Sequence, residues 1–191
     1  MLERATIEAT KYLMTHGAEH IKGKVLDAGC GRQPYKRLFE HKVDEWVGYD
    51  MRPVGNVVGL IEQLDFPCDT FDCVLLTFVL EYLPDEHMAM AELARVLKPG
   101  GHIIIITPHS WPDDKAYRRY TVWGIQMLCE KAGLKMVHAC TLAGFFKAKF
   151  EAFIAWSKFS LSFPREMGGF IGALDTDMPM LSVVCATKEK K

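Results

Sequence analysis

The sequence predicts an open α/β fold built on a mostly parallel sheet. Segments with the pattern of strands alternate along the chain with segments of helical periodicity, which is typical of a sheet covered by helices. Four consecutive isoleucines, Ile103–Ile106, predict a central strand that is buried on both faces. A glycine-rich turn over Asp27–Gln33 directly follows the first apolar, strand-like stretch. Together these three features predict one open sheet with helices on both faces.

The individual elements follow from periodicity and from residues that cap or break helices. Apolar residues at helical spacing predict a covering helix over 2–16, and Asp85 and Thr121 have the positions of N-caps. Pro99–Gly101 and Gly133 end helices. In chain order, the expected elements are a helix at 2–16, a strand ending near 28, a helix at 34–41, a strand ending at 50, a short strand at 56–60, a strand at 71–77, a helix at 86–97, a strand at 102–107, a helix at 122–131, and strands at 134–139 and 180–187.

One edge of the sheet has little room for covering helices. About six residues separate Asp50 from the next strand, whereas a crossover between parallel strands normally needs about a dozen, usually with a helix. Six extended residues span roughly 20 Å, so the chain can return there only as a bare segment. The next connection, Ile61–Thr70, is also too short and too broken for a proper helix. We therefore expect this edge to be shielded by another subunit or to be unusually mobile.

Composition indicates an ordinary globular chain. Its 191 residues are 49% hydrophobic and carry a formal net charge of −1, so we expect a single domain and no nucleic-acid partner, since nucleic-acid-binding domains are usually basic. The six cysteines form no C-x-x-C pair, which indicates reduced thiols and no metal site. Charged Glu3, Arg4 and Glu8 interrupt any apolar signal-peptide core, so we expect a cytoplasmic protein.

The turn and a downstream acid predict a site for an adenosine-bearing ligand. Gly29 and Gly31 let the backbone approach a ligand closely, and Asp50 ends the second strand nineteen positions after Gly31. A carboxylate at that place accepts hydrogen bonds from ribose hydroxyls. A nicotinamide dinucleotide site requires a third glycine, and this chain has Pro34 instead. A smaller ligand without a pyrophosphate is therefore favoured, and a nicotinamide oxidoreductase is the weaker alternative.

Six short motifs occur in order over about residues 22–140. They are Val25–Gly31, Asp50, Asp65–Pro67, Phe71–Val74, Leu97–Gly101 and Tyr117–Thr121. In this order and spacing they resemble the motifs of class I S-adenosylmethionine-dependent methyltransferases of the small "type 11" kind. The resemblance implies a Rossmann-like sheet of seven strands in the order 3-2-1-4-5-7-6, with strand seven antiparallel, and the short connections described above predict reduced coverage around strand three. It also implies S-adenosylmethionine as the cofactor.

The resemblance further implies which residues hold the cofactor. Asp27 is expected to hold the amino group of the methionine part, directly or through water, while Asp50 binds the ribose and Asp65 the adenine amino group. The alternative for these three acids is that they shape or cap turns. Gln33 replaces the glycine of many family members, so its side chain either narrows the cofactor entrance or points outward. The expected cofactor-binding residues are Asp27, Gly29, Cys30, Gly31, Asp50, Met51, Asp65, Phe66, Thr77 and Phe78.

Residues that follow the fourth and fifth strands are candidates for the acceptor side. A general base is needed only if the acceptor must lose a proton, and His109 is the candidate. Arg118 and Arg119 can clamp a carboxylate or phosphate, although loop solvation is the plainer role for all three. No Asn-Pro-Pro-Tyr run follows the fourth strand, which disfavours amino-group methylation on DNA bases or protein glutamine. The expected acceptor-side residues are Tyr82, His109, Arg118, Arg119 and Tyr120.

An aromatic and basic segment at about 144–165 precedes the last strand. Lysines 147, 149 and 158 make it too charged to span a bilayer. It is expected to form a helical insertion that covers the active site, contacts a second copy in a homodimer, or lies on a membrane surface where a lipid-linked acceptor would be found.

We therefore expect residues 1–191 to form one methyltransferase domain that acts on a small-molecule or carbohydrate- or lipid-linked acceptor, at oxygen. The alternative is a non-catalytic module that binds S-adenosylmethionine for regulation or assembly. The two differ in whether His109 and the cluster at 118–120 face the transferred methyl group.

Overall fold

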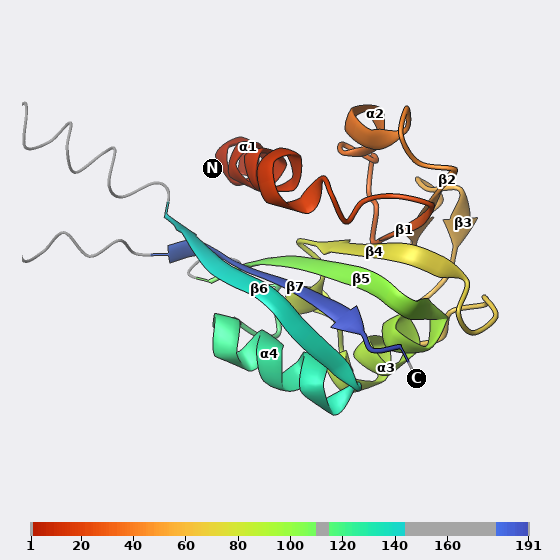
Figure 1. Ribbon diagram of the computed structural model, residues 1–191. Coiled ribbons are helices and arrows are strands. Elements are labelled where there is room, and N and C mark those ends of the chain that lie inside the picture. The colour runs from red at the N-terminus through yellow and green to blue at the C-terminus, as the bar shows by residue number, and fades with distance from the viewer. Residues whose placement is uncertain (1, 110–114, 144–178, 191) are drawn as a thin grey trace, which may run out of the picture.

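The computed structural model describes residues 2–109, 115–143 and 179–190, and it shows a sheet with helices on both faces (Figure 1). The seven strands lie in the order β3-β2-β1-β4-β5-β7-β6. Strands β1 to β5 pair in parallel, whereas β7 runs antiparallel to both β5 and β6. This is the strand order and the antiparallel strand that the resemblance implied, so the predicted fold class is confirmed.

The elements alternate along the chain as the sequence predicts. Their bounds are α1 (Leu2–Tyr12) continued by a π-helical turn η1 (Leu13–Gly17), β1 (Lys24–Ala28), α2 (Lys36–Phe39), β2 (Glu45–Asp50), β3 (Val57–Val58), β4 (Phe71–Thr77), a 3-10 turn η2 (Leu80–Tyr82), α3 (Glu86–Val96), β5 (Leu97–Pro108), α4 (Val122–Lys131), β6 (Leu134–Ala143) and β7 (Pro179–Lys188). Asp85 and Thr121 cap α3 and α4 as expected, since their side chains accept hydrogen bonds from the Met88 and Gly124 N–H groups.

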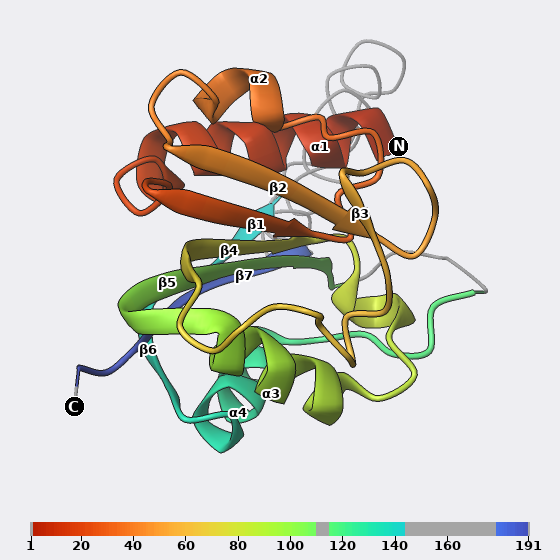
Figure 2. The same cartoon turned by 90° about the vertical axis from the view of Figure 1, so that its right-hand side faces the viewer.

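The sheet separates two hydrophobic cores. Figure 2 shows α1 and α2 on one face of the sheet and α3 and α4 on the other. Successive residues of a strand point to opposite faces. Ile104 and Ile106 therefore belong to the core under α1 and α2, and Ile103 and Ile105 to the core under α3 and α4. All four are fully buried, which confirms the predicted central strand.

Several predicted boundaries were wrong, among them the end of β6, which was expected at 139 and lies at Ala143. The helix expected at 34–41 is a single turn, Lys36–Phe39. Strand β5 was expected to begin at His102 but begins at Leu97, because the chain pairs with Phe71 of β4 before an irregularity in the ladder. A side chain on Gly101 would meet the Asp72 carbonyl oxygen at 2.9 Å, so the glycine lets the two strands approach closely rather than forming a turn.

The thin edge of the sheet has the bare connections that the sequence predicts. Strand β3 has only two residues, and both the link into it and the link out to β4 are helix-free. Val58 and Leu60 each expose 57% of their surface there. Shielding of this edge by a second subunit stays a prediction.

Helix α3 holds the loop between β3 and β4. In a sheet with complete coverage, a crossover helix would support this connection. Arg95 donates hydrogen bonds to the Phe66 carbonyl at 2.7 Å and to the Leu64 carbonyl at 2.9 Å. Glu92 pairs with Arg95 at 2.7 Å and accepts a hydrogen bond from the Leu64 N–H at 2.9 Å. The pair thus fixes the segment that carries Asp65 and Phe66, two of the expected adenine-side residues.

Replacement of Arg95 by alanine should therefore destabilise the fold. We expect Arg95→Ala to lower the free energy of unfolding by about 2 kcal/mol, because charged hydrogen bonds to carbonyls are lost and Glu92 loses its partner. Urea denaturation of Arg95→Ala beside Arg37→Ala measures this, since Arg37 is an exposed arginine on α2. Equal stability of the two variants would contradict the proposed support of the loop.

Candidate cofactor and acceptor site

The turn after β1 is tied to the end of β2. The N–H groups of Gly29 and Cys30 both donate to the Tyr49 carbonyl, at 2.7 and 3.0 Å. Gly29 has φ +73°, and a side chain there would collide with Val79, so only glycine fits. At Gly31, where φ is +50°, a side chain would meet no atom within 4 Å. The turn therefore leaves open space beside Gly31, as a ligand-binding loop requires.

Asp50 is held in its charged form at the end of β2. Its Oδ2 accepts the Gly31 N–H at 3.0 Å, and its Oδ1 accepts the backbone N–H and the Nε of Arg52 at 2.9 and 3.2 Å. Burial opposes ionisation, but these hydrogen bonds outweigh it and lower the pKa of Asp50. The carboxylate thus faces the glycine turn as an anion.

Asp27 differs from Asp50 because its surroundings oppose ionisation. It is fully buried at the end of β1, and neither carboxylate oxygen has a hydrogen-bond partner among the described residues. Burial and, second, the charge of Asp50 raise its pKa to about 7. A buried carboxylate without a partner is costly, so this position favours a ligand that brings a positive charge or a donor.

Tyr35 joins Asp27 at the centre of the site. Burial and then the charge of Asp27 raise the pKa of Tyr35 to about 12, while a hydrogen bond with Thr77 opposes the rise. Thr77, at the end of β4, is buried as well, and Phe78 follows with φ +57° and donates its N–H to Ile106 at 2.8 Å. Tyr35 was not among the predicted site residues, although it lies two positions after the glycine-rich turn.

The adenine-side candidates lie at the thin edge of the sheet. Met51 is 70% exposed and Asp65 is exposed, so both are open to a ligand. Phe66 is half-buried and its ring contacts those of Tyr49 and Phe71, with ring centres 5.8 and 5.0 Å apart. These contacts fix the backbone beside Asp65.

Gln33 packs inward, toward β2. It has φ +56°, a conformation that favours glycine, and its side chain lies so close to Gly48 that an added methyl there would be 2.8 Å from the Gln33 amide carbon. Asn56 accepts the Gly48 N–H at 3.2 Å from the same side. The side chain thus lies against β2 at Gly48, an arrangement that neither expectation for Gln33 described.

The acceptor-side candidates form a polar group beyond β4 and β5. Arg118 pairs with Glu86 at 2.9 Å and donates to the Leu83 carbonyl at 3.0 Å. Glu81 is buried and accepts the Thr107 hydroxyl at 2.9 Å. Arg118 is therefore bound to the chain itself. Tyr82 and Arg119 lie at the surface, and Arg119 donates to the Arg118 carbonyl at 3.0 Å.

His109 follows the end of β5 and contacts β7. Its Nδ1 lies 3.2 Å from the Ser182 hydroxyl oxygen, and Ser182 donates to the Tyr120 carbonyl at 2.8 Å. Ser182 and Tyr120 are buried, while His109 is half-buried. The fold thus links His109 to the Tyr120 carbonyl through a serine that the sequence did not single out.

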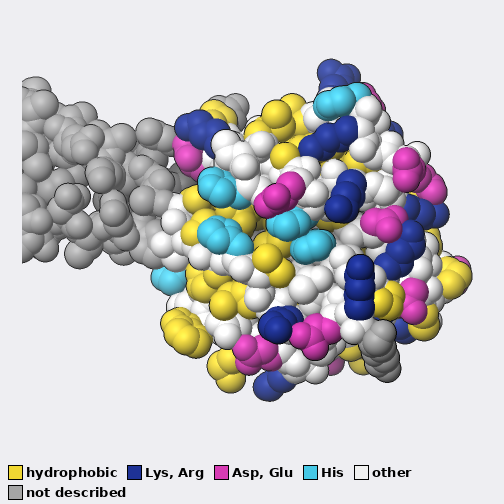
Figure 3. Space-filling view, viewed as in Figure 1, with side chains coloured by type: hydrophobic (Ala, Val, Ile, Leu, Met, Phe, Trp, Pro, Cys, Tyr) yellow, Lys and Arg dark blue, Asp and Glu magenta, His cyan; other side chains and the backbone are white. Residues whose placement is uncertain are grey.

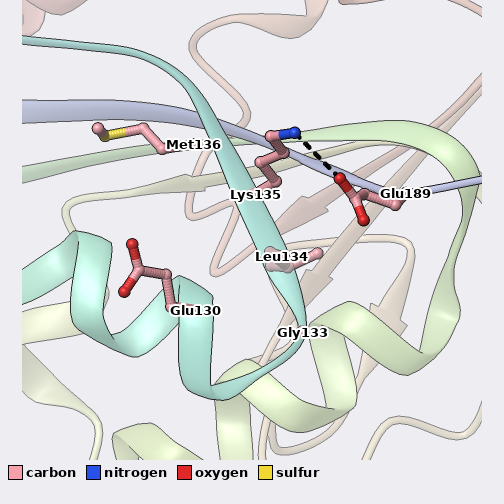
Figure 4. A pocket seen from close by; sticks show the side chains of 6 residues that line it. All are labelled: Glu130, Gly133, Leu134, Lys135, Met136 and Glu189. Atoms are coloured by element: carbon pink, nitrogen blue, oxygen red, sulfur yellow. Dashed lines mark hydrogen bonds and ion pairs between the residues drawn. The ribbon is translucent and has the colours of Figure 1, made fainter.

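Two hollows lie away from this edge. One of about 290 Å³ is lined by Glu130, Gly133, Leu134, Lys135, Met136 and Glu189 (Figure 4). It lies where β6 begins, at the amino edge of the parallel strands, whereas open α/β sheets bind ligands at the carboxyl edge. Lys135 and Glu189 pair across it at 3.1 Å. We therefore do not assign the cofactor to this hollow.

The second hollow, of about 230 Å³, lies between η1 and β6 on a face rich in histidine (Figure 3). The rings of His16 and His138 are stacked with centres 5.9 Å apart, and those of His20 and His102 at 4.2 Å. In the described ranges, no three His, Cys, Asp or Glu side chains are grouped so that they could hold a metal ion.

A family model described as a methyltransferase domain matches residues 4–148. The chain belongs to this methyltransferase family. Its cofactor is S-adenosylmethionine. Curated relatives are named ubiquinone/menaquinone biosynthesis C-methyltransferase UbiE: that of Saccharophagus degradans is 38% identical over 78 residues, and that of Escherichia coli O1:K1 is 40% identical over 74. These matches cover 38% and 36% of this chain and only 31% and 30% of the relatives, so the chain matches about a third of their length.

Solved structures share the fold of this methyltransferase. YcgJ from Bacillus subtilis superposes with a TM-score of 0.65 at 20% identity, covering 96% of this chain and 99% of the other. An S-adenosylmethionine-dependent methyltransferase from Mesorhizobium loti gives 0.64 at 19% identity, with 96% and 98% covered. The protein crystallised with the Haloferax volcanii Trm112 methyltransferase activator gives 0.73 at 17%, with 100% and 92% covered.

The residues of the site fit S-adenosylmethionine. The carboxylate of Asp27, which lacks a partner, suits the ammonium of the methionine part, and complete burial favours contact through water or after a small shift of the turn. The ionised Asp50 suits the ribose hydroxyls, and the open space beside Gly31 admits the ligand. The roles of the individual residues stay predictions.

Replacement of Asp27 by asparagine should stabilise the protein while weakening cofactor binding. The unfolded chain releases this proton near pH 4 and the folded chain near pH 7, so burial of Asp27 costs stability as pH rises across that range. We expect Asp27→Asn to be more stable than the parent by over about 1 kcal/mol at pH 8, since one pKa unit corresponds to ~1.4 kcal/mol. Thermal melts of both proteins at pH 4 and pH 8 test this. The prediction is contradicted if the stability difference between Asp27→Asn and the parent does not grow with pH.

Replacement of Asp50 by alanine should weaken S-adenosylhomocysteine binding by about 1.5–3 kcal/mol, the usual loss for a charged hydrogen-bond partner. Calorimetry measures the change, and Asp44→Ala, an exposed acid just before β2, is the matched control. An unchanged dissociation constant in Asp50→Ala would show that the ribose lies elsewhere.

Proposed function

We propose that this methyltransferase methylates a hydroxyl-bearing small molecule and that His109 removes the hydroxyl proton. The observation that carries the proposal is the place of His109: it lies just past the end of β5, where it is tied to β7 and is close to the buried Glu81–Thr107 pair. Ligands of open α/β sheets bind at this strand edge. Histidine is the side chain that most often serves as a general base in proton transfer.

The chain would contribute chiefly alignment and one proton transfer. When bound, the cofactor supplies a methyl group that its sulfonium already makes electrophilic. Asp27, Asp50 and the turn orient that group, and such alignment can contribute roughly 7–11 kcal/mol. Arg118 pairs with Glu86, which favours a neutral acceptor over a carboxylate or phosphate.

Oxygen is the proposed site of methylation, and carbon is the second candidate. The names of the curated relatives favour carbon, since those proteins are C-methyltransferases of quinone biosynthesis. A phenol or enol acceptor loses its hydroxyl proton on either route, because the resulting anion is nucleophilic both at oxygen and at carbon, which is the ortho or para ring carbon of a phenolate or the far carbon of the enolate double bond. His109 would therefore serve both reactions.

The other expected acceptors and partners remain proposals. Carbohydrate- or lipid-linked acceptors, membrane contact and a homodimer through 144–165 involve a segment outside the described residues. Among the described helices, none is long and apolar enough to cross a membrane. Cytoplasmic location also stays a proposal.

The proposed base can be tested by S-adenosylhomocysteine release. A panel of phenols, enols and sugars identifies an acceptor, and His109→Gln should then lower kcat about 10²–10⁴-fold, the usual contribution of a general base. His41→Gln, which removes an exposed histidine after α2, is the control and should keep full activity. Binding of S-adenosylhomocysteine without turnover on any acceptor would favour the non-catalytic alternative.

A further inference from the structure

Ser182 has the geometry of a residue that sets the protonation pattern of His109. It lies on β7, 73 positions from His109, and is fully buried. On the sheet it pairs directly with Thr107 of β5, so its position is fixed by the ladder between the two strands. Its hydroxyl contacts two groups, the Tyr120 carbonyl and the His109 Nδ1.

The direction of these two hydrogen bonds follows from the number of protons. A serine hydroxyl has one proton, and a carbonyl oxygen can only accept. The 2.8 Å bond from Ser182 to Tyr120 therefore uses the hydroxyl proton. The 3.2 Å contact then requires that the His109 Nδ1 carries a proton and donates it to the serine oxygen.

This arrangement leaves Nε2 as the basic nitrogen of neutral His109. When the ring gains a proton at Nε2, Nδ1 still donates to Ser182, so the hydrogen bonds need no rearrangement during proton transfer. In histidines of this kind, the hydrogen bond on one nitrogen decides the tautomer of the ring.

We propose that Ser182 is a positioning residue that holds His109 in the Nδ1–H tautomer and thereby makes Nε2 the nitrogen that accepts the acceptor's proton. The proposal rests on the proposed function of His109 as base. Ser182 itself touches neither cofactor nor acceptor in this role. Its carbonyl partner belongs to Tyr120, the last residue before the cap of α4. The Ser182 hydroxyl oxygen on β7 therefore links the end of β5 to the start of α4.

Nitrogen NMR of the full chain tests the tautomer directly. The chain has seven histidines, so ¹⁵N-histidine spectra at pH 8 can be assigned by the signals that disappear in His109→Gln. We expect the proton of neutral His109 on Nδ1 in the parent protein and a shift toward Nε2–H in Ser182→Ala. A parent protein with the proton on Nε2 would overturn the proposal without any variant.

Thr187→Ala is the matched control. Thr187 also lies on β7, and its hydroxyl donates to the Gly101 carbonyl at 2.8 Å, so this variant removes the same type of bond from the other end of the strand. It should leave the His109 tautomer unchanged. If both variants change the tautomer equally, the effect comes from strand β7 as a whole and the proposal is wrong.

Kinetics separate this proposal from the proposed function. With an acceptor in hand, Ser182→Ala should lower kcat about tenfold, a part of the 10²–10⁴ that a base supplies, while the cofactor Kd stays unchanged. If His109→Gln keeps full activity, the base assignment fails even where the tautomer result holds. If His109→Gln is inactive but Ser182→Ala leaves both tautomer and kcat unchanged, the base stands and the role of Ser182 fails.

Discussion

The buried carboxylate of Asp27 is the constraint on which the site depends. The chain places it at the end of β1 without a partner, next to a second carboxylate, and so holds it near the boundary between its neutral and charged forms. Such a group lowers stability and suits a cationic ligand, and functional sites often carry a cost of this kind. Asp50 differs because backbone and side-chain donors satisfy it before any ligand arrives.

The two carboxylates differ in what they are suited to bind. Asp50 is tied to Gly31 and so couples the glycine turn to β2, while Asp27 is more deeply buried and lies near Tyr35. One acid is therefore ready for neutral hydroxyls and the other for a positive charge. The resident ligand of the family, S-adenosylmethionine, has both chemical features. Beyond it, the polar residues from β4, β5 and β7 form the side on which we propose that the acceptor binds.

Local patterns in the sequence were enough to predict the architecture and the glycine turn. Alternation, caps and the isoleucine run are short-range signals, and the structure confirms the sheet order that the family motifs implied. Other features depend on partners far along the chain. The start of β5 is set by pairing with Phe71, the conformation of Gln33 by packing on Gly48, and Ser182 meets His109 only because β5 and β7 are neighbours. These contacts join residues that are far apart in the chain, so no short stretch of the sequence could reveal them.

The hydrogen bonds from α3 to the loop at 64–66 have a consequence for how the sequence of this loop can vary. Two side chains of a neighbouring helix, Glu92 and Arg95, hold the adenine-side segment by its backbone. Support of this kind does not depend on the identity of the residues in the loop. The segment can therefore change sequence while its path over the sheet edge is preserved.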